Sequence, residues 1–292
     1  MKFTKYKKFK LFARRNFPMT LNRIFILLRK YDRTYGGELK LLNEIVDLLP
    51  ENSIQSFVDI GSGDGFNMSS SYFLVKSGRR GLLIDGDPIA ISHARKIYKN
   101  LGSTTIRCLK LNPGNITRVL SDAGYSHVDY LKIDIDSFDL TILNQLLRDG
   151  FRPKVFSIEI NERIPPSLYF DVKYTKNGRY DSKVIYGCSI ASANVAASKF
   201  DYTLYKLAYN NAFFIQSELL RKIYPEFNRN LSEIYFDGYV NAPDRLKLFP
   251  WNKSFESWIT SNPENLYDIL LKQIEYLHLN YPVEIRVNDA KY

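Results

Sequence analysis

The stretch SFVDIGSGDGFNMSSSYFLVKSG, residues 56–78, combines three features that decide the fold. Its apolar start predicts a buried strand, glycines follow at Gly61, Gly63 and Gly65, and the later residues predict a helix. A strand, a glycine-rich turn and a helix in this order form the ligand-binding turn of open α/β sheets. The stretch therefore predicts an α/β fold that holds a ligand at this turn.

Strands and helices alternate on both sides of this stretch. Apolar runs predict strands at 54–60, 81–85, 104–109, 128–135 and 154–160. Helical patterns predict helices at about 37–49, 66–77, 88–101, 115–123, 137–149 and 188–199. Two apolar runs around Asn210-Asn211 predict a β-hairpin over 202–216. Such a hairpin puts an antiparallel strand into a mostly parallel seven-stranded sheet, the plan of the Rossmann-like class I fold of S-adenosylmethionine-dependent methyltransferases.

The length and composition favour one main domain with two extensions. The chain has 292 residues, and 45% of them are hydrophobic, which is enough for a sizeable core. We expect a basic arm and helix over 1–49, an S-adenosylmethionine-binding domain over 50–216, and an extension over 217–292 that packs on it. A helix is expected near 264–279. The 21 Tyr and 19 Phe form either the core or a surface for planar or sugar-like ligands.

The charge and cysteine content bear on location and partners. The net charge of +10 suits nucleic acid, anionic lipid or an anionic substrate. Residues 1–15 are basic without an acid and carry aromatic residues at every third position, which indicates either a patch for an anionic membrane surface or nucleic acid, or a solvated arm. Cys108 and Cys188 lie far apart, so a cytoplasmic location is expected, with peripheral membrane contact through the arm as an alternative.

The spacing of the glycine turn favours a cationic ligand over a dinucleotide. A dinucleotide turn reads GxGxxG, whereas this turn reads GxGxG and has Asp59 two residues before its first glycine. The Asp59 carboxylate would repel a diphosphate. S-adenosylmethionine instead carries a sulfonium and an ammonium group, and the glycines would let the backbone approach its amino-acid part.

An acidic residue ends the next strand, in GLLIDGDP. Carboxylates at this place accept hydrogen bonds from ribose hydroxyls in nucleotide-binding folds. Asp85 and Asp87 are both candidates, and Asp85 is preferred because it directly ends the apolar run. The alternative for either residue is to cap the helix that begins near Pro88.

Several ordered motifs resemble the FkbM-type methyltransferases and their relatives. These motifs are the glycine stretch with GLLIDGDP, NITRVL, YLKIDIDSFD, FSIEINERIPP and YGCSIASANVAASKFDYTLYKLAYNNAFFI, and the resemblance covers about residues 50–216. It implies methylation of hydroxyl groups on sugars or secondary metabolites. It also implies that Asn115 lies near the adenine, with a helix N-cap as the alternative. Ser137 stands where this family usually has glycine.

Polar residues at the ends of two strands are the candidates for the chemistry. Asp134, Asp136, Glu159 and Asn161 follow the fourth and fifth strands, where ligands bind in open α/β sheets. Asp134, Asp136 or Glu159 could take the hydroxyl proton directly as a general base. Alternatively, Asp134, Glu159 and Asn161 could hold Mg²⁺, or the carboxylates could be structural. His93 and His127 are expected outside this zone, and neither is expected to act as the base.

Two other function classes stay open. The positive charge suggests a nucleic-acid methyltransferase acting on RNA, but the sequence has no (Asp/Asn)-Pro-Pro-(Tyr/Phe) motif after the fourth strand and no Pro-Cys pair. Catalytic lysines would also be needed near Asp134 for 2′-hydroxyl methylation, and Lys132 is expected to point away from the cleft. A non-catalytic scaffold is disfavoured by the intact glycine turn and Asp85. The sequence therefore favours an O-methyltransferase with a small-molecule or glycan acceptor.

Overall fold

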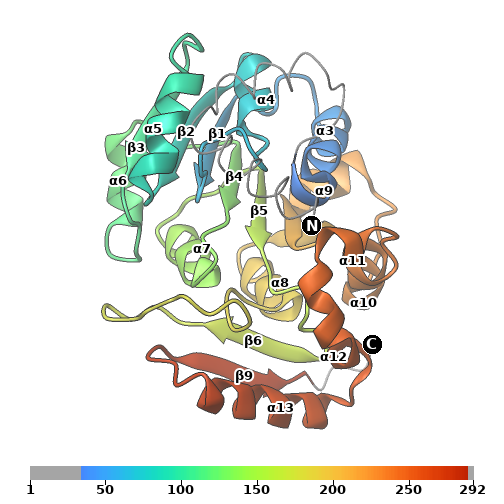
Figure 1. Cartoon of the computed structure of the whole chain (residues 1–292). Coiled ribbons are helices and arrows are strands. Elements are labelled where there is room, and N and C mark those ends of the chain that lie inside the picture. Colours follow the sequence, from blue (N-terminus) through green and yellow to red (C-terminus); the bar gives the residue numbers. More distant parts are fainter. Residues whose placement is uncertain (1–33, 289–292) are drawn as a thin grey trace, which may run out of the picture.

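A seven-stranded sheet forms the centre of the computed structural model, which describes residues 34–288 (Figure 1). The strands are β1 (Ser56–Ile60), β2 (Arg80–Asp85), β3 (Thr104–Cys108), β4 (Tyr130–Ile133), β5 (Val155–Glu159), β7 (Tyr202–Ala208) and β8 (Asn211–Gln216). They lie in the order β3-β2-β1-β4-β5-β8-β7. Strands β1 to β5 are parallel, and β8 is antiparallel to both β5 and β7. This arrangement confirms the predicted class I methyltransferase fold.

Helices cover both faces of this sheet. One face carries α6 (Ile116–Asp122), α7 (Asp139–Arg148), α8 (Ile190–Ser198) and α10 (Leu231–Tyr235). The other carries α3 (Glu38–Leu48), α4 (Ser71–Lys76), α5 (Pro88–Ile97) and α9 (Ser217–Ile223). A parallel sheet needs this cover because both of its faces are apolar.

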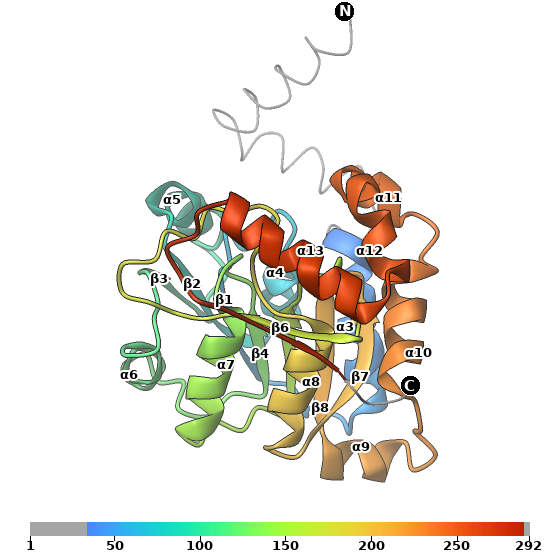
Figure 2. The same ribbon diagram turned by 90° about the horizontal axis from the view of Figure 1, so that it is seen from below.

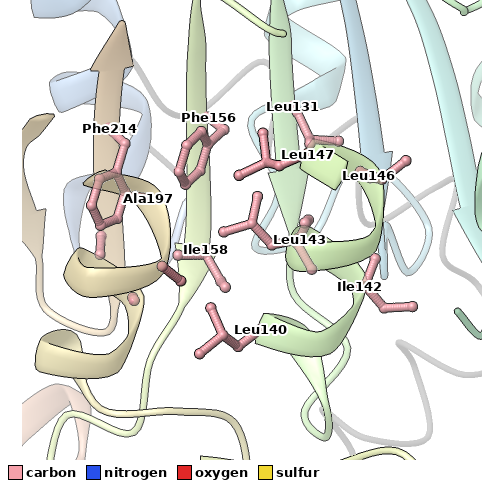
Figure 3. Packing of buried hydrophobic residues seen from close by; sticks show 14 of the residues in the cluster. Leu131, Leu140, Ile142, Leu143, Leu146, Leu147, Phe156, Ile158, Ala197 and Phe214 are labelled. Atoms are coloured by element: carbon pink, nitrogen blue, oxygen red, sulfur yellow. The ribbon is translucent and has the colours of Figure 1, made fainter. Parts of the chain in front are cut away.

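Helix α7 illustrates how the apolar spacing in the sequence builds the core. Its leucines recur at intervals of three or four residues, and Figure 3 shows Leu143 and Leu147 directed at Phe156 and Ile158 of β5. All four side chains are fully buried. Burying one such side chain contributes about 1.5–3 kcal/mol, so this contact fixes the helix on the sheet.

A second, two-stranded sheet was not predicted. Strands β6 (Leu168–Val172) and β9 (Val283–Val287) pair antiparallel, and α13 (Pro263–Tyr276) packs beside them (Figure 2). Leu266 and Leu270 of α13 share one buried cluster with Leu168 and Phe170 of β6. The C-terminal extension is thus joined to the main domain by strand pairing. Its other elements are η2 (Phe236–Val240), α11 (Arg245–Leu248), η3 (Pro250–Phe255) and α12 (Glu256–Thr260), and η1 (Tyr35–Gly37) precedes α3.

The predicted helix at 66–77 begins only at Ser71, for an identifiable reason. The Asp64 carboxylate accepts hydrogen bonds from the amides of Phe66 and Asn67, and Met68 has a positive φ of 57°. These contacts hold residues 64–68 as a turn, since side-chain bonds to local amides compete with helix formation.

Two expectations concern the membrane. Within residues 34–288 no helix is long and apolar enough to cross a bilayer. The basic segment over residues 1–15, for which a membrane-surface or nucleic-acid contact is predicted, lies outside the described residues.

Candidate functional site

A cleft of about 1510 Å³ opens at the carboxyl ends of the parallel strands. We call its two parts the glycine-loop side and the aromatic side. The glycine-loop side is lined by residues that follow β1 and β2, namely Gly61, Ser62, Gly63, Asp85 and Gly86. The aromatic side is lined by Arg163, Tyr186, Phe249, Trp251 and Phe255. Asp134 and Glu159, at the ends of the central strands β4 and β5, also line the cleft.

The glycines of the turn serve different purposes. Gly61 has a φ of +83°, and a Cβ there would lie 1.6 Å from the carbonyl oxygen of Asp134, so Gly61 lets the turn touch β4. Gly63 has a φ of +56°, and a Cβ there would meet no atom within 4 Å. Gly65 packs against Leu83 and Tyr98 and does not line the cleft. Gly63 is therefore the glycine that leaves room for a ligand.

Asp59 lies beneath this turn and retains an unused carboxylate oxygen. Its Oδ2 accepts hydrogen bonds from Ser69 at 3.0 Å and Ser71 at 2.6 Å. Its Oδ1 and the Ser62 hydroxyl are buried, have no hydrogen-bond partner within residues 34–288, and belong to residues that line the cleft. Burying a polar atom without a partner costs free energy, which a donor on a ligand would recover. The arrangement suits the cationic group predicted for this place.

The two acids after β2 have separate roles. Asp85 lines the cleft, and its two oxygens accept hydrogen bonds from the amides of Gly63 at 2.8 Å and Asp87 at 2.7 Å. Asp87 is the N-cap of α5, where it accepts a hydrogen bond from Ile89, and it does not line the cleft. Asp87 therefore caps α5, as the alternative to ligand binding predicted, whereas Asp85 lines the cleft.

Asn115 lies outside the cleft wall. Its side chain accepts a hydrogen bond from the amide of Asn112 and donates one to the carbonyl of Lys110. It makes no side-chain cap for α6. The residues of this loop that do line the cleft include Leu109, Leu111 and Asn112, and Asn115 acts by fixing the loop that carries them.

Lys132 is placed opposite to the expectation. It lines the cleft, where its ammonium lies 2.7 Å from Glu38 of α3 and 3.5 Å from Asp134. The expectation was wrong because Lys132 and Asp134 are two residues apart and so share one face of β4. Burial lowers the pKa of Lys132, but the carboxylates, led by Glu38 and Asp134, raise it well above its ordinary value. Lys132 is thus a fixed cation under the cleft.

The electrostatics of Asp134 suit proton transfer near neutral pH. Its side chain is 29% exposed. Burial raises its pKa, Lys132 lowers it and Asp136 raises it, so that the pKa of Asp134 is about 6. A general base works best with a pKa near the working pH, so Asp134 is suited to that role.

The turn after β4 is shaped by Asp136 and Asp139 rather than by a glycine. Asp136 lines the cleft and has a φ of +55°, a conformation that aspartate tolerates. The buried Asp139 carboxylate accepts hydrogen bonds from the amides of Ile135 at 2.7 Å and Ser137 at 2.9 Å. Ser137 can therefore replace the glycine usual in the resembled family, because the left-handed residue is its neighbour.

Glu159 is buried and lines the cleft beside Asn210. Its Oε1 accepts a hydrogen bond from Asn210 at 2.8 Å, and its Oε2 has no partner among the described residues. Burial, followed by the neighbouring carboxyls Asp134 and Asp136, raises the pKa of Glu159 well above its ordinary value. This shift favours the protonated form of the Glu159 carboxyl, which makes Asp134 the better suited of the two as a proton acceptor.

The residues present do not fit the predicted Mg²⁺ site. Asn161 does not line the cleft, and its amide donates hydrogen bonds to the carbonyls of Val184 and Tyr186. Asp134 already faces the ammonium of Lys132. No group of three or more His, Cys, Asp or Glu side chains within residues 34–288 is arranged to hold a metal ion. Of the three residues predicted to hold Mg²⁺, only Asp134 and Glu159 line the cleft.

On the aromatic side, Arg163 is held by a buried polar network. Its Nε donates to Asn252 at 2.7 Å, and Asn252 also donates to Glu162. Glu162 in turn accepts a hydrogen bond from the Tyr186 hydroxyl at 2.9 Å. The guanidinium carbon lies 5.5 Å from the ring centre of Tyr186 and 5.0 Å from that of Phe255. These contacts fix Arg163 in one orientation at the cleft.

The sequence reasoning missed several residues of this cleft. The missed residues are Glu38, Lys132 and Arg163. Only Lys132 could have been predicted from the sequence, because side chains two residues apart in a strand share one face. His93, in α5, and His127, in the exposed loop before β4, do not line the cleft, in line with the expectation that neither is the base.

Comparison with known proteins shows similarity to solved structures at the level of the fold alone. The chain matches no protein-family model and no curated protein. An O-methyltransferase from Bacillus cereus in complex with SAH is 16% identical, with a TM-score of 0.42, over 67% of this chain and 86% of that one. A methyltransferase from Geobacter sulfurreducens is 18% identical, with a TM-score of 0.40, over 68% and 86%. Monomeric WbdD is 14% identical, with a TM-score of 0.42, over 64% of this chain and 42% of that one, so the chain spans less than half of WbdD.

Proposed function

We propose that this chain is an S-adenosylmethionine-dependent O-methyltransferase that acts on a hydroxyl group of a sugar, glycan or secondary metabolite. The observation that carries the proposal is the pairing, in one cleft, of a glycine turn over the unpartnered Oδ1 of Asp59 with Asp134, whose pKa is about 6. The strand order agrees with this function. The resemblance to the FkbM-type methyltransferases supports the same acceptor class.

The glycine-loop side would hold the cofactor through its own residues. The backbone at Gly63 leaves the space, Asp59 and Ser62 offer buried polar atoms, and Asp85 offers a carboxylate for ribose hydroxyls. The bound cofactor would supply an electrophilic methyl group. Asp85 is already oriented by two backbone amides, so it binds a diol without first being ordered.

Asp134 would take the proton of the acceptor hydroxyl. Above about pH 6 it is ionised, and Lys132 at 3.5 Å stabilises that charge. Glu159, whose buried Oε2 has no partner among the described residues and whose pKa is raised by burial, would instead position the acceptor through a hydrogen bond. Asp136, exposed at the turn and lining the same cleft, would act through its charge, which raises the pKa of Asp134.

Two alternatives are tested by the same experiment, a methyl-transfer screen with radiolabelled S-adenosylmethionine against nucleotide sugars, oligosaccharides and RNA. Label on a sugar supports the proposal. Label on RNA alone favours the nucleic-acid alternative, which gains some support from Lys132 beside Asp134. No transfer, together with no cofactor binding, favours a scaffold.

A further inference from the structure

Buried polar atoms without partners also occur in the cleft where the end of β5 pairs with the start of β8. Glu159 Oε2 and Asn211 Oδ1 are buried, lack hydrogen-bond partners within residues 34–288, and belong to residues that line the cleft. Asn210 orients both side chains, because it donates to Glu159 and accepts from Asn211. Two buried oxygens without partners on neighbouring residues are suited to hydrogen bonds with the hydroxyl groups of a polyol.

Arg163 is the one cleft-lining arginine that is almost fully buried, with 3% of its surface exposed. Its Nε and Nη1 donate to Asn252 and to the carbonyl of Lys183, both at 2.7 Å. No residue between 34 and 288 accepts a hydrogen bond from its Nη2. A buried guanidinium with a free donor edge is suited to a carboxylate or phosphate.

The charges around Arg163 leave this side positive. Glu162 offsets part of the charge, at 4.0 Å, but both of its oxygens already accept hydrogen bonds from Asn252 and Tyr186. Lys183, whose carbonyl accepts from Arg163, also lines the cleft and has no ion-pair partner within the described part of the chain, whereas the cleft-lining Arg179 and Asp181 pair with each other. An anionic group is therefore favoured here over a neutral one.

We propose, building on the proposed O-methyltransferase function, that the acceptor is an acidic sugar whose carboxylate or phosphate binds Arg163 while its ring lies against Trp251. Glu159 and Asn211 bind its hydroxyl groups and so present one of them to Asp134. Arg163 is thus a specificity residue for the acid group rather than a catalytic residue.

The test measures binding of three probes to the full chain in the presence of SAH by calorimetry: glucuronate, glucose 6-phosphate and methyl glucoside. We expect at least one acidic sugar to bind about tenfold or more tightly than the neutral one, the usual scale of a charge-assisted hydrogen bond. The two acidic probes distinguish a carboxylate from a phosphate. Arg163→Met removes the preference, whereas the same substitution at Arg286, an exposed arginine that stacks on Tyr169 outside the cleft, retains it.

Trp251→Ala provides a second variant, because Trp251 is 52% exposed and its removal does not open the core. It weakens all sugars alike and keeps the acidic preference. Equal binding of acidic and neutral probes to the wild type, binding of no acidic probe at about 10 mM, or a preference that survives Arg163→Met would overturn the proposal. A wild type that methylates neutral sugars alone would retain the O-methyltransferase function while refuting the acid subsite. A chain that binds acidic sugars but not SAH would retain the acid subsite while refuting the O-methyltransferase function.

Discussion

The glycine turn offers a sharp prediction when its Gly61 and Gly63 are compared with Gly78, which lies outside the turn. All three have a left-handed φ, so their alanine variants differ in what the new Cβ meets. In Gly61→Ala, the new Cβ lies 1.6 Å from the Asp134 carbonyl oxygen, so the turn and β4 must separate by about 1.4 Å to reach even a tight contact. In Gly63→Ala and Gly78→Ala, the new Cβ meets no atom within 4 Å. Gly63 lines the cleft and Gly78 does not.

The magnitudes follow from these contacts. All three variants carry the left-handed cost of alanine, about 1–2 kcal/mol. Gly61→Ala also strains the hydrogen bonds from Gly61 to Ile84 and from Asp134 to Ile60, both at 2.9 Å, at about 1 kcal/mol each. We therefore expect Gly61→Ala to lower the free energy of unfolding by about 3–4 kcal/mol, and the other two variants by about 1–2 kcal/mol.

Urea unfolding and SAH calorimetry on the same three proteins test this reasoning. Gly63→Ala unfolds like Gly78→Ala but binds SAH at least about tenfold more weakly, because its methyl group occupies ligand space. Equal unfolding midpoints for Gly61→Ala and Gly78→Ala would refute the close approach of the turn to β4. Equal SAH affinity for Gly63→Ala and Gly78→Ala would remove this turn from the cofactor site.

Three further predictions concern charge. Asp134→Asn lowers turnover about 100-fold with little change in SAH affinity. The wild-type rate falls below about pH 6, where Asp134 becomes protonated, and this fall is absent from the pH–rate profile of the variant. A wild-type rate that is flat down to pH 5 would contradict the assignment. Lys132→Met leaves the buried Glu38 without its ion-pair partner and lowers the free energy of unfolding in urea by about 3–5 kcal/mol. The Lys132→Met/Glu38→Gln double variant recovers most of this free energy, and an equal loss in the single and double variants would mean that the pair is not coupled. Turnover is insensitive to EDTA, because the cleft carboxylates do not fit a metal site, and loss of activity that Mg²⁺ restores would reverse that conclusion.

Much of the fold could be predicted from local patterns. The alternation of apolar runs and the Asn210-Asn211 hairpin predicted a mostly parallel seven-stranded sheet that ends in an antiparallel hairpin, because each of these elements is short and has its own local signal. The pairing of β6 with β9 was missed, because it joins segments more than 100 residues apart and β9, VEIRV, is short and partly exposed. No local signal encodes such a partner.

The site could be predicted only where strand ends marked it. Asp59, Asp85 and Asp134 were found because each lies at or next to the end of an apolar run. Arg163 and Glu38 reach the cleft through tertiary packing, from a loop and from a helix before the glycine turn, and no spacing rule points to them. Asn161 was expected at the cleft but does not line it, because its amide nitrogen donates to the carbonyls of Val184 and Tyr186 in a loop that only the folded chain brings there.

The most direct test of the account is calorimetric titration of the wild-type chain with SAH and, separately, with NAD. We predict one SAH site per chain, no heat from NAD, and an affinity for SAH that Asp85→Ala weakens by about 1–3 kcal/mol, because ribose hydroxyls lose their acceptor. Binding of NAD in place of SAH, or SAH affinity unchanged in Asp85→Ala, would contradict the assignment of this cleft to S-adenosylmethionine.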